Sequence, residues 1–223
     1  PLRRMFALGA PIGIQYELEY GVFAVVGIMM GWMGTAQLAG HQVALNLASL
    51  TFMVPLGVSA AAAVLVGHAV GRGDIAEARR AAAAGLVCGV GFMAASALVM
   101  LPFPRFLAGI YTTDVGVAAL AASLIPIAGV FQVFDGIQVV SVGILRGVGD
   151  TRAPMVVNLL GFWLVGLPVS AALGFAVGAG PRGLWWGLTV GLVLVGVVLI
   201  WRVRRRLMGE VRRVVIDRDV VGA

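Results

Sequence analysis

Long apolar stretches alternate with short polar segments along the whole chain. A helix needs about 20 mostly apolar residues to cross about 30 Å of hydrocarbon, and six stretches reach or approach that length. They lie at about 8–32, 38–66, 81–101, 117–143, 153–177 and 184–201. The pattern predicts an all-α integral membrane protein, a bundle of six transmembrane helices.

Prolines stand inside four of these stretches, at Pro11, Pro55, Pro126 and Pro168. Each removes a backbone hydrogen-bond donor and favours a kink. In lipid, kinks are tolerated where neighbouring helices or a wet cavity satisfy the freed carbonyls. The six stretches are therefore expected to pack together rather than to act as isolated anchors.

The composition agrees with a membrane protein, because 61% of the residues are hydrophobic, 12% are charged and the mean hydropathy is +1.02. A soluble domain carries about twice that charged fraction. The net charge of +6 does not indicate nucleic-acid binding, which needs a basic face on a folded domain. Here arginines separate apolar runs, so membrane lipids and no nucleic acid are the expected partners.

The arginines also predict an orientation, because arginine in short loops is biased toward the cytoplasm. If the chain starts in the cytoplasm, 14 of the 16 basic residues fall on that side. These are Arg3, Arg4, Arg72, Arg79, Arg80, Arg146, Arg152, Arg202, Arg204, Arg205, Arg206, Arg212, Arg213 and Arg218. Arg105 and Arg182 remain for the outside, so both ends of this segment are expected to be cytoplasmic. The tryptophans expected at the membrane interfaces are Trp32, Trp185 and Trp186 outside and Trp201 inside.

The division of the chain follows from the same pattern. Residues 1–207 are expected to form one membrane lobe, and 208–223 a cytoplasmic tail. The chain begins with Pro1 and not with an initiator Met, which is expected of a piece of a longer protein.

An eight-residue pattern occurs twice. Segments 67–74 and 143–150 share three glycines and an aspartate at equivalent positions, 76 residues apart. Glycines four apart let helices approach closely, the last glycine can end a helix in the left-handed conformation, and the aspartate can cap the next helix. The repeat predicts duplicated helix–turn–helix architecture, as many transporters have.

Three acidic residues, Glu17, Glu19 and Asp135, lie inside predicted spans. A carboxylate near the bilayer centre costs about 2.5 kcal/mol or more, so such residues usually face a bundle interior and serve ion or proton pathways. Along the helix axis, Glu19 lies roughly 22 Å from Arg4 and Asp135 roughly 16 Å from Arg146. No arginine stands inside a predicted span, so a bound cation, a proton or water is expected to balance both carboxylates.

Helical geometry separates the two acids of the first span. Glu17 and Glu19 are about 200° apart around a helix, so they cannot face one cavity, and Gln15 shares the side of Glu19. Further amides inside the spans are Asn46, Gln132 and Gln138. These amides either line the same cavity as Glu19 and Asp135 or only hold helices together.

No catalytic or metal-binding pattern accompanies these residues. His41 and His68 are the only histidines, and neither a third histidine nor a nearby cysteine completes a metal site. A hydrolytic triad of His41, a serine and Asp135 lacks the Gly-x-Ser-x-Gly nucleophile motif. The sequence predicts neither an enzyme nor a cofactor other than a coupling ion.

Several motifs resemble the multidrug and toxic compound extrusion (MATE) family. The stretch GHQVALNLASL at 40–50, followed by MVPLG at 53–57, is similar to the eighth helix of that family. Similar motifs follow in order, namely VGHAVGRGD at 66–74, Leu107 to Thr112, FQVFDGIQVV at 131–140 and LRGVGDT at 145–151. The resemblance covers nearly the whole chain.

The resemblance implies that residues 1–223 correspond to the carboxyl-terminal lobe, helices seven to twelve, of a twelve-helix exporter of the NorM-like branch. Members of that branch couple drug efflux to Na⁺ or H⁺ through a Glu on helix seven and an Asp on helix ten. Glu19 and Asp135 match these positions, and they would ligate the metal ion if Na⁺ is the coupling ion. Phe131 stands where some members have a Tyr near the cation.

The function implied is a cation-coupled antiporter of the bacterial inner membrane. Its substrates would be organic cations, its cavity would be lined by Gln15, Asn46, Phe131, Gln132 and Gln138, and its missing partner would be the amino-terminal lobe. One alternative is a lipid-intermediate flippase of a related branch. Another is a membrane scaffold that transports nothing, which would tolerate neutralisation of Glu19 and Asp135.

Overall fold

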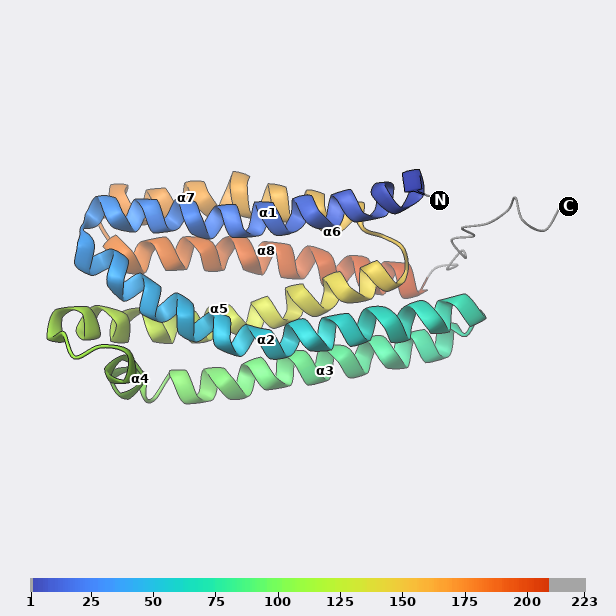
Figure 1. Cartoon of the computed structure of the whole chain (residues 1–223), viewed down its shortest axis with the longest axis horizontal. Coiled ribbons are helices and arrows are strands. Elements are labelled where there is room, and N and C mark those ends of the chain that lie inside the picture. The colour runs from blue at the N-terminus through green and yellow to red at the C-terminus, as the bar shows by residue number, and fades with distance from the viewer. Residues whose placement is uncertain (1, 209–223) are drawn as a thin grey trace, which may run out of the picture.

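Six long helical rods run back and forth in the computed structural model, which describes residues 2–208 (Figure 1). The elements are α1 (Leu2–Met33), α2 (Thr35–Arg72), α3 (Ile75–Met100), α4 (Pro104–Tyr111), α5 (Val115–Gly147), α6 (Arg152–Asn158), η1 (Leu159–Gly166), α7 (Leu167–Ala171), η2 (Ala172–Ala176) and α8 (Gly180–Met208). Within the described residues, six segments are long and apolar enough to cross a membrane, the fifth being α6 to η2. This confirms the predicted all-α, six-span architecture. The predicted tail beyond Met208 lies outside the described residues.

Several helices are longer than the apolar stretches that predicted them. The second helix runs on to Arg72, past the predicted end at 66, and the last continues to Met208, past 201. Hydropathy marks only the part of a helix that suits hydrocarbon, and α-helical hydrogen bonding continues into the polar turns until a terminating residue is reached.

The two copies of the repeated pattern fold in the same way. Gly73 and Gly149 both have φ of 78°, which is favourable for glycine and strained for other residues. In each copy the glycine and the next residue donate their backbone N–H groups to carbonyls of the last helical turn, at 2.8–3.0 Å. This pair of bonds is the glycine-terminated ending of a helix, and it confirms the predicted helix–turn–helix repeat.

The aspartates of the two copies have different hydrogen-bond partners. Asp74 accepts a hydrogen bond from the backbone N–H of Glu77 at 2.8 Å and caps α3, as predicted. Asp150 makes no such cap, because its carboxylate instead contacts Arg202 at 2.8 Å and Arg206 at 2.9 Å on α8. Burial raises the pKa of the Asp150 carboxyl, but the hydrogen bonds and charges of both arginines outweigh it and hold the pKa below its usual value.

Close packing of α2 on α5 depends on the glycines of the second copy. A Cβ atom on Gly143 would approach the carbonyl oxygen of Ser59 to 2.3 Å, and one on Gly147 would approach that of Ala63 to 2.7 Å. The Ser59 hydroxyl donates to the carbonyl of Val139 at 2.7 Å across the same interface. Small residues and one buried hydrogen bond therefore join the two helices, as predicted for glycines four apart.

The fifth span changes its hydrogen-bond register twice. In its two π-helical segments, η1 and η2, a backbone N–H donates to the carbonyl five residues earlier, for example from Leu167 to Phe162. Pro168 follows directly and has no N–H to donate, so the regular α-helical ladder is interrupted here. Wider turns of this kind occur where such a ladder is disturbed.

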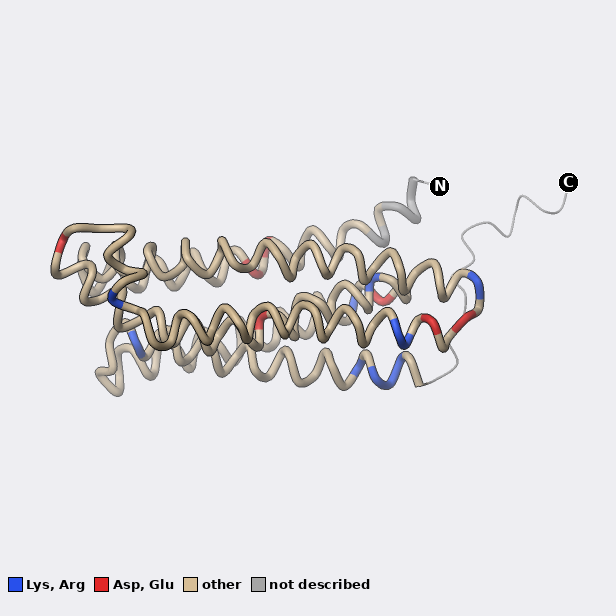
Figure 2. The backbone as a smooth tube through the Cα atoms, turned by 90° about the horizontal axis from the view of Figure 1, so that it is seen from below, with Lys and Arg blue, Asp and Glu red and all other residues tan. Residues whose placement is uncertain are grey.

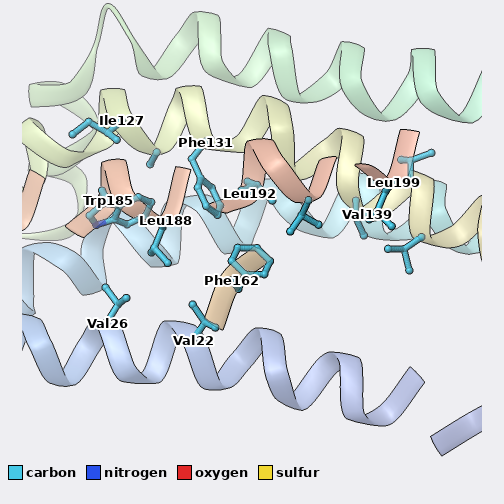
Figure 3. Packing of buried hydrophobic residues seen from close by; sticks show 14 of the residues in the cluster. Val22, Val26, Ile127, Phe131, Val139, Phe162, Trp185, Leu188, Leu192 and Leu199 are labelled. Carbon is cyan, nitrogen blue, oxygen red and sulfur yellow. The ribbon is translucent and has the colours of Figure 1, made fainter. Parts of the chain in front are cut away.

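The apolar core includes residues from all six spans, and one part of it lies between α1, α5 and α8. Figure 3 shows Val22 and Val26 pointing from α1 toward Phe162 and Leu188, close to Trp185. The side chain of Trp185 is fully buried, so it packs inside the lobe and does not face lipid, and its position at the level of the outer interface stays a prediction. Trp32, Trp186 and Trp201 remain exposed on the helical surface.

The charged residues gather at the two ends of the bundle (Figure 2), with acidic positions also at mid-length. One end carries the turn between α2 and α3, the turn between α5 and α6, and the end of α8. We call this the arginine-rich end. By the bounds of these helices, it holds Arg72, Arg79, Arg80, Arg146, Arg152, Arg202, Arg204, Arg205 and Arg206.

Candidate cation and substrate site

A cavity of about 170 Å³ opens between α1, α2 and α5, with one residue from α8. Glu19 of α1 and Asp135 of α5 both line it, so the fold brings together the two acids that the sequence singled out. The other lining residues are Tyr16, Tyr20, Phe23, Leu45, Ala48, Ser49, Phe52, Met53, Leu56, Phe131 and Trp185. Two carboxyl groups thus share a mostly apolar and aromatic chamber.

The two acids sit differently in this chamber. The side chain of Asp135 is 8% exposed, whereas Glu19 is half-buried. They are close enough to act on each other electrostatically, and like charges held together out of water are unfavourable unless a proton or cation is shared. The pair is therefore suited to bind one positive charge.

Polar side chains behind the cavity hold Glu19 in place. The Gln138 amide donates to the Glu19 carboxylate at 3.4 Å and to the Asn158 side-chain oxygen at 3.5 Å. The Gln138 side-chain oxygen and the Asn158 amide nitrogen are buried without a hydrogen-bond partner. Buried polar atoms normally have partners, so this cluster has bonding capacity left for a ligand.

A basic residue reaches this region from the arginine-rich end. The Arg146 guanidinium donates to the Tyr16 hydroxyl at 3.0 Å and to the Gln15 side-chain oxygen at 3.4 Å. Its charge acts on the Glu19 carboxylate, one helical turn farther along α1. Arg146 follows the predicted fourth span, as expected, but its side chain extends back into the neighbourhood of Glu19. Arg146 lies in the last turn of α5, and its long side chain extends back along the helix to α1.

Three aromatic rings form one wall of the chamber, and the ring of His41 adjoins them. Phe23 and Phe131 are edge-to-face with centroids 6.0 Å apart, and Phe131 and Trp185 are 5.9 Å apart. The Trp185 ring in turn meets His41 at 5.7 Å. Aromatic faces attract organic cations, so this wall and the two acids have complementary roles.

Among the aromatic residues that line the chamber, sequence reasoning found only Phe131. Tyr16, Tyr20 and Phe23 were missed, although they recur with Glu19 at helical spacing on one side of α1. That spacing is the signal that could have found them. Trp185 carried no such signal, because it lies in a uniformly apolar span.

Some amides predicted to line the cavity point elsewhere. Gln132 accepts a hydrogen bond from Ser96 at 3.3 Å, so it faces α3. Asn46 is exposed and donates to the carbonyl of Gln42 on its own helix at 2.9 Å. Neither lines the chamber, and Gln15 and Gln138 lie behind its wall. The exposed Glu17 lies outside the chamber, on another side of α1 from Glu19.

A second cavity of about 470 Å³ adjoins the first between α1 and α2, and shares Tyr20, Phe23 and Leu45 with it. The fully buried His41 lines this second space, and both of its ring nitrogens are without a hydrogen-bond partner. No cluster of three histidine, cysteine or acidic side chains that could hold a metal occurs in residues 2–208. The two cavities are therefore neighbours, and two aromatic side chains, Tyr20 and Phe23, line both of them.

Curated relatives match nearly all of this chain. It is 44% identical over 203 residues to the multidrug resistance protein NorM of Burkholderia vietnamiensis, covering 89% of this chain and 44% of that protein. It is 47% identical over 197 residues to a probable NorM of Xanthomonas axonopodis pv. citri, covering 88% and 43% respectively. The chain therefore spans less than half the length of these relatives.

Solved structures share the fold. A eukaryotic MATE transporter, AtDTX14, superposes with a TM-score of 0.84 at 23% identity, covering 92% of this chain and 49% of that one. The Vibrio cholerae MATE transporter VcmN in its bent form gives 0.84 at 20% identity, covering 93% and 47%. The family model MatE matches residues 11–172. With six membrane-spanning helices and these relatives, the chain is a multi-pass membrane protein that belongs to the MatE family.

Proposed function

We propose that this chain is the carboxyl-terminal lobe of a cation-coupled antiporter that exports cationic, amphipathic compounds across a bacterial inner membrane. Its match to somewhat less than half of NorM multidrug resistance proteins supports this assignment. A second lobe of similar size would complete the transporter. Alternating access would then arise from rocking of the two lobes about a central site.

One observation carries the proposal: Glu19 and Asp135 line the same aromatic chamber. Carboxylate oxygens suit a proton as well as a hard cation such as Na⁺, which favours oxygen ligands. The unpartnered side-chain oxygen of Gln138 fits the same donor set. These three residues would hold the coupling ion, and its charge would offset part of the charge of the two carboxylates.

The exchange follows from charge. While the acids are ionised, the chamber attracts an organic cation to its aromatic wall. When the coupling ion occupies the acids, that attraction is lost and the substrate leaves. Because one set of acids serves both ions, binding of one opposes binding of the other. The coupling ion supplies the driving force, and the lobe supplies the shared site.

The acidic character of the chamber also separates this function from the alternatives. A flippase for anionic lipid intermediates would need a basic cavity, whereas Glu19 and Asp135 stand inside this one. A scaffold would not need either acid. The distribution of arginines supports a cytoplasmic arginine-rich end.

The test is efflux of ethidium from cells expressing the full-length transporter at matched membrane levels. We expect Glu19→Gln and Asp135→Asn each to abolish cation-driven efflux, because a neutral amide neither exchanges a proton nor balances Na⁺. The double variant should be little worse, since residues that act as a unit give non-additive losses. Glu17→Gln is the matched control on the same helix and should retain efflux. Retained efflux in both site variants would refute a coupling role for these acids, and a wild type without efflux would favour a scaffold.

A further inference from the structure

Arg146 makes an unusual set of contacts for an arginine at a helix end. It bonds to two side chains of α1, it stacks over the Tyr16 ring at 5.0 Å, and its Nε atom is buried without a partner. Exposed arginines at the same end pair with acids instead, as Arg72 does with Glu77 at 2.6 Å. Arg146 is therefore directed inward, toward the site, and not toward solvent.

The repeated helix ending does not require an arginine at this position. In the first copy the equivalent residue is Val70, which is buried and belongs to the apolar core. Both copies nevertheless form the same glycine-terminated turn. Since the same turn forms in the first copy with a valine at this position, the turn does not require the charge of Arg146, which must have another role.

Tyr16 connects this charge to the cavity. It accepts the hydrogen bond from Arg146 and its ring lines the same chamber as Glu19 and Asp135. The backbone of α1 packs mainly on α2 and α6, whereas it reaches α5 through the side-chain contacts of Arg146, Gln138 and Phe131. The guanidinium is thus a fixed positive charge that acts on the Glu19 carboxylate, at the edge of the chamber that Glu19 and Asp135 share.

We propose that Arg146 is the resident counter-charge of the Glu19–Asp135 site, and that it limits the site to one net negative charge. Two carboxylates and one guanidinium sum to minus one, so a single monovalent cation neutralises the site and can still be released. This inference rests on the proposed function and adds Arg146 as a positioning residue, acting through Tyr16 and through its field. Removing its charge should make the site bind cations too tightly.

The experiment measures ethidium affinity of the purified full-length transporter in detergent, by fluorescence, at about pH 8 to limit competition by protons. Two unit charges roughly 10 Å apart at an effective dielectric constant of about 20 change affinity on the order of tenfold. We expect Arg146→Gln to tighten binding by about that factor, and Glu19→Gln to weaken it by about that factor. The double variant restores a net charge of minus one and should bind within about threefold of wild type. Arg146→Lys should also stay near wild type.

The Arg146 and Glu19 variants are expected to change ethidium affinity in opposite directions. This distinguishes a counter-charge from a structural role, since a damaged site would weaken binding in every variant. Arg72→Gln, at an exposed ion pair of the same end, is the control and should leave affinity unchanged. If Arg146→Gln fails to fold, Arg146→Met keeps the apolar stem and gives the same expectation. If Arg146→Gln and Arg146→Met bind ethidium as wild type does or more weakly, while Glu19→Gln still weakens binding, the counter-charge role of Arg146 is refuted and the proposed function stands. Unchanged binding in Glu19→Gln overturns the proposed function itself.

Discussion

A single methyl group at Gly143 should test whether the α2–α5 interface is as tight as the structure shows. In Gly143→Ala, the new Cβ would lie 2.3 Å from the carbonyl oxygen of Ser59 and 2.4 Å from its hydroxyl oxygen. Neither is the free end of a flexible side chain, because the hydroxyl is bonded to the carbonyl of Val139. Relief therefore requires the two helices to separate by about 1 Å, given that ordinary contacts of this kind exceed about 3 Å.

The expected cost has two parts. Overpacking of a close-packed interface costs typically 1–3 kcal/mol, and a lost buried hydrogen bond inside a membrane protein adds about 0.6 kcal/mol. Together they lower the free energy of unfolding by roughly 2–4 kcal/mol, which corresponds to a midpoint lower by on the order of 10 °C. Since α2 and α5 form two walls of the chamber, separation should also weaken ethidium binding.

The assay is thermal unfolding of the full-length transporter in detergent, followed by the loss of monodisperse protein. Gly91→Ala on α3 is the matched control, because a Cβ there meets nothing within 4 Å. Alanine favours a helix over glycine by about 0.5–1 kcal/mol, so this control should be as stable as wild type or slightly more stable. Equal midpoints for the Gly143 and Gly91 variants would show that the interface is looser than described.

Three further predictions concern the orientation of the chain, its activity without a second lobe, and the ion pair of Asp150. In a variant whose Cys88 is replaced by Ser, single cysteines introduced at Gly109 and Ala179 should react with an impermeant thiol reagent from outside intact cells, whereas one at Ile75 should not. Labelling with the opposite sidedness would refute the predicted orientation. This chain expressed alone should insert into the membrane yet confer no ethidium resistance, and resistance without a second lobe would contradict the half-transporter assignment unless the chain forms a homodimer. Because the pKa of Asp150 is lowered in the folded protein, its stabilising effect is full above the usual pKa of about 3.9 and is lost as the pH falls through the lowered value. Asp150→Asn should thus lower the free energy of unfolding by about 1–3 kcal/mol near pH 7, measured as a lower unfolding midpoint. The difference in midpoint from wild type should disappear in acid. A difference that does not depend on pH would contradict the ion-pair origin.

The fold was predictable because lipid imposes strict requirements on a spanning segment. Apolar length and the repeated glycine turns were enough to identify six helices and the shape of two helix endings. The ends of the helices were not predictable from hydropathy, as the extension of α2 to Arg72 shows. The role of Asp150 was missed because its partners lie on α8, far away in sequence.

The candidate site was only partly predictable, for reasons of helix geometry. Glu19 and Asp135 were identified because ionisable residues are costly inside a membrane. Residues three apart turn by about 60° from one another, so Gln132, Asp135 and Gln138 fan out toward α3, the chamber and α1 respectively. A polar stripe in the sequence therefore served three different neighbours. The inward reach of Arg146 depends on the position of α1, which no local pattern encodes.

The two π-helical segments of the fifth span have a consequence for comparing relatives. Each wide turn holds one residue more than an α-helical turn, so it is equivalent to a one-residue insertion that the helix absorbs. Deleting one residue within η1 (Leu159–Gly166) would return that turn to the α register and leave the parts on either side of it facing the same neighbours. Gly187 of α8, where an added Cβ would meet Ser170 at 2.2 Å, would then still need to be a glycine. Homologues that lack the wide turn should therefore carry a single gap here in sequence alignments and keep a small residue at the position of Gly187.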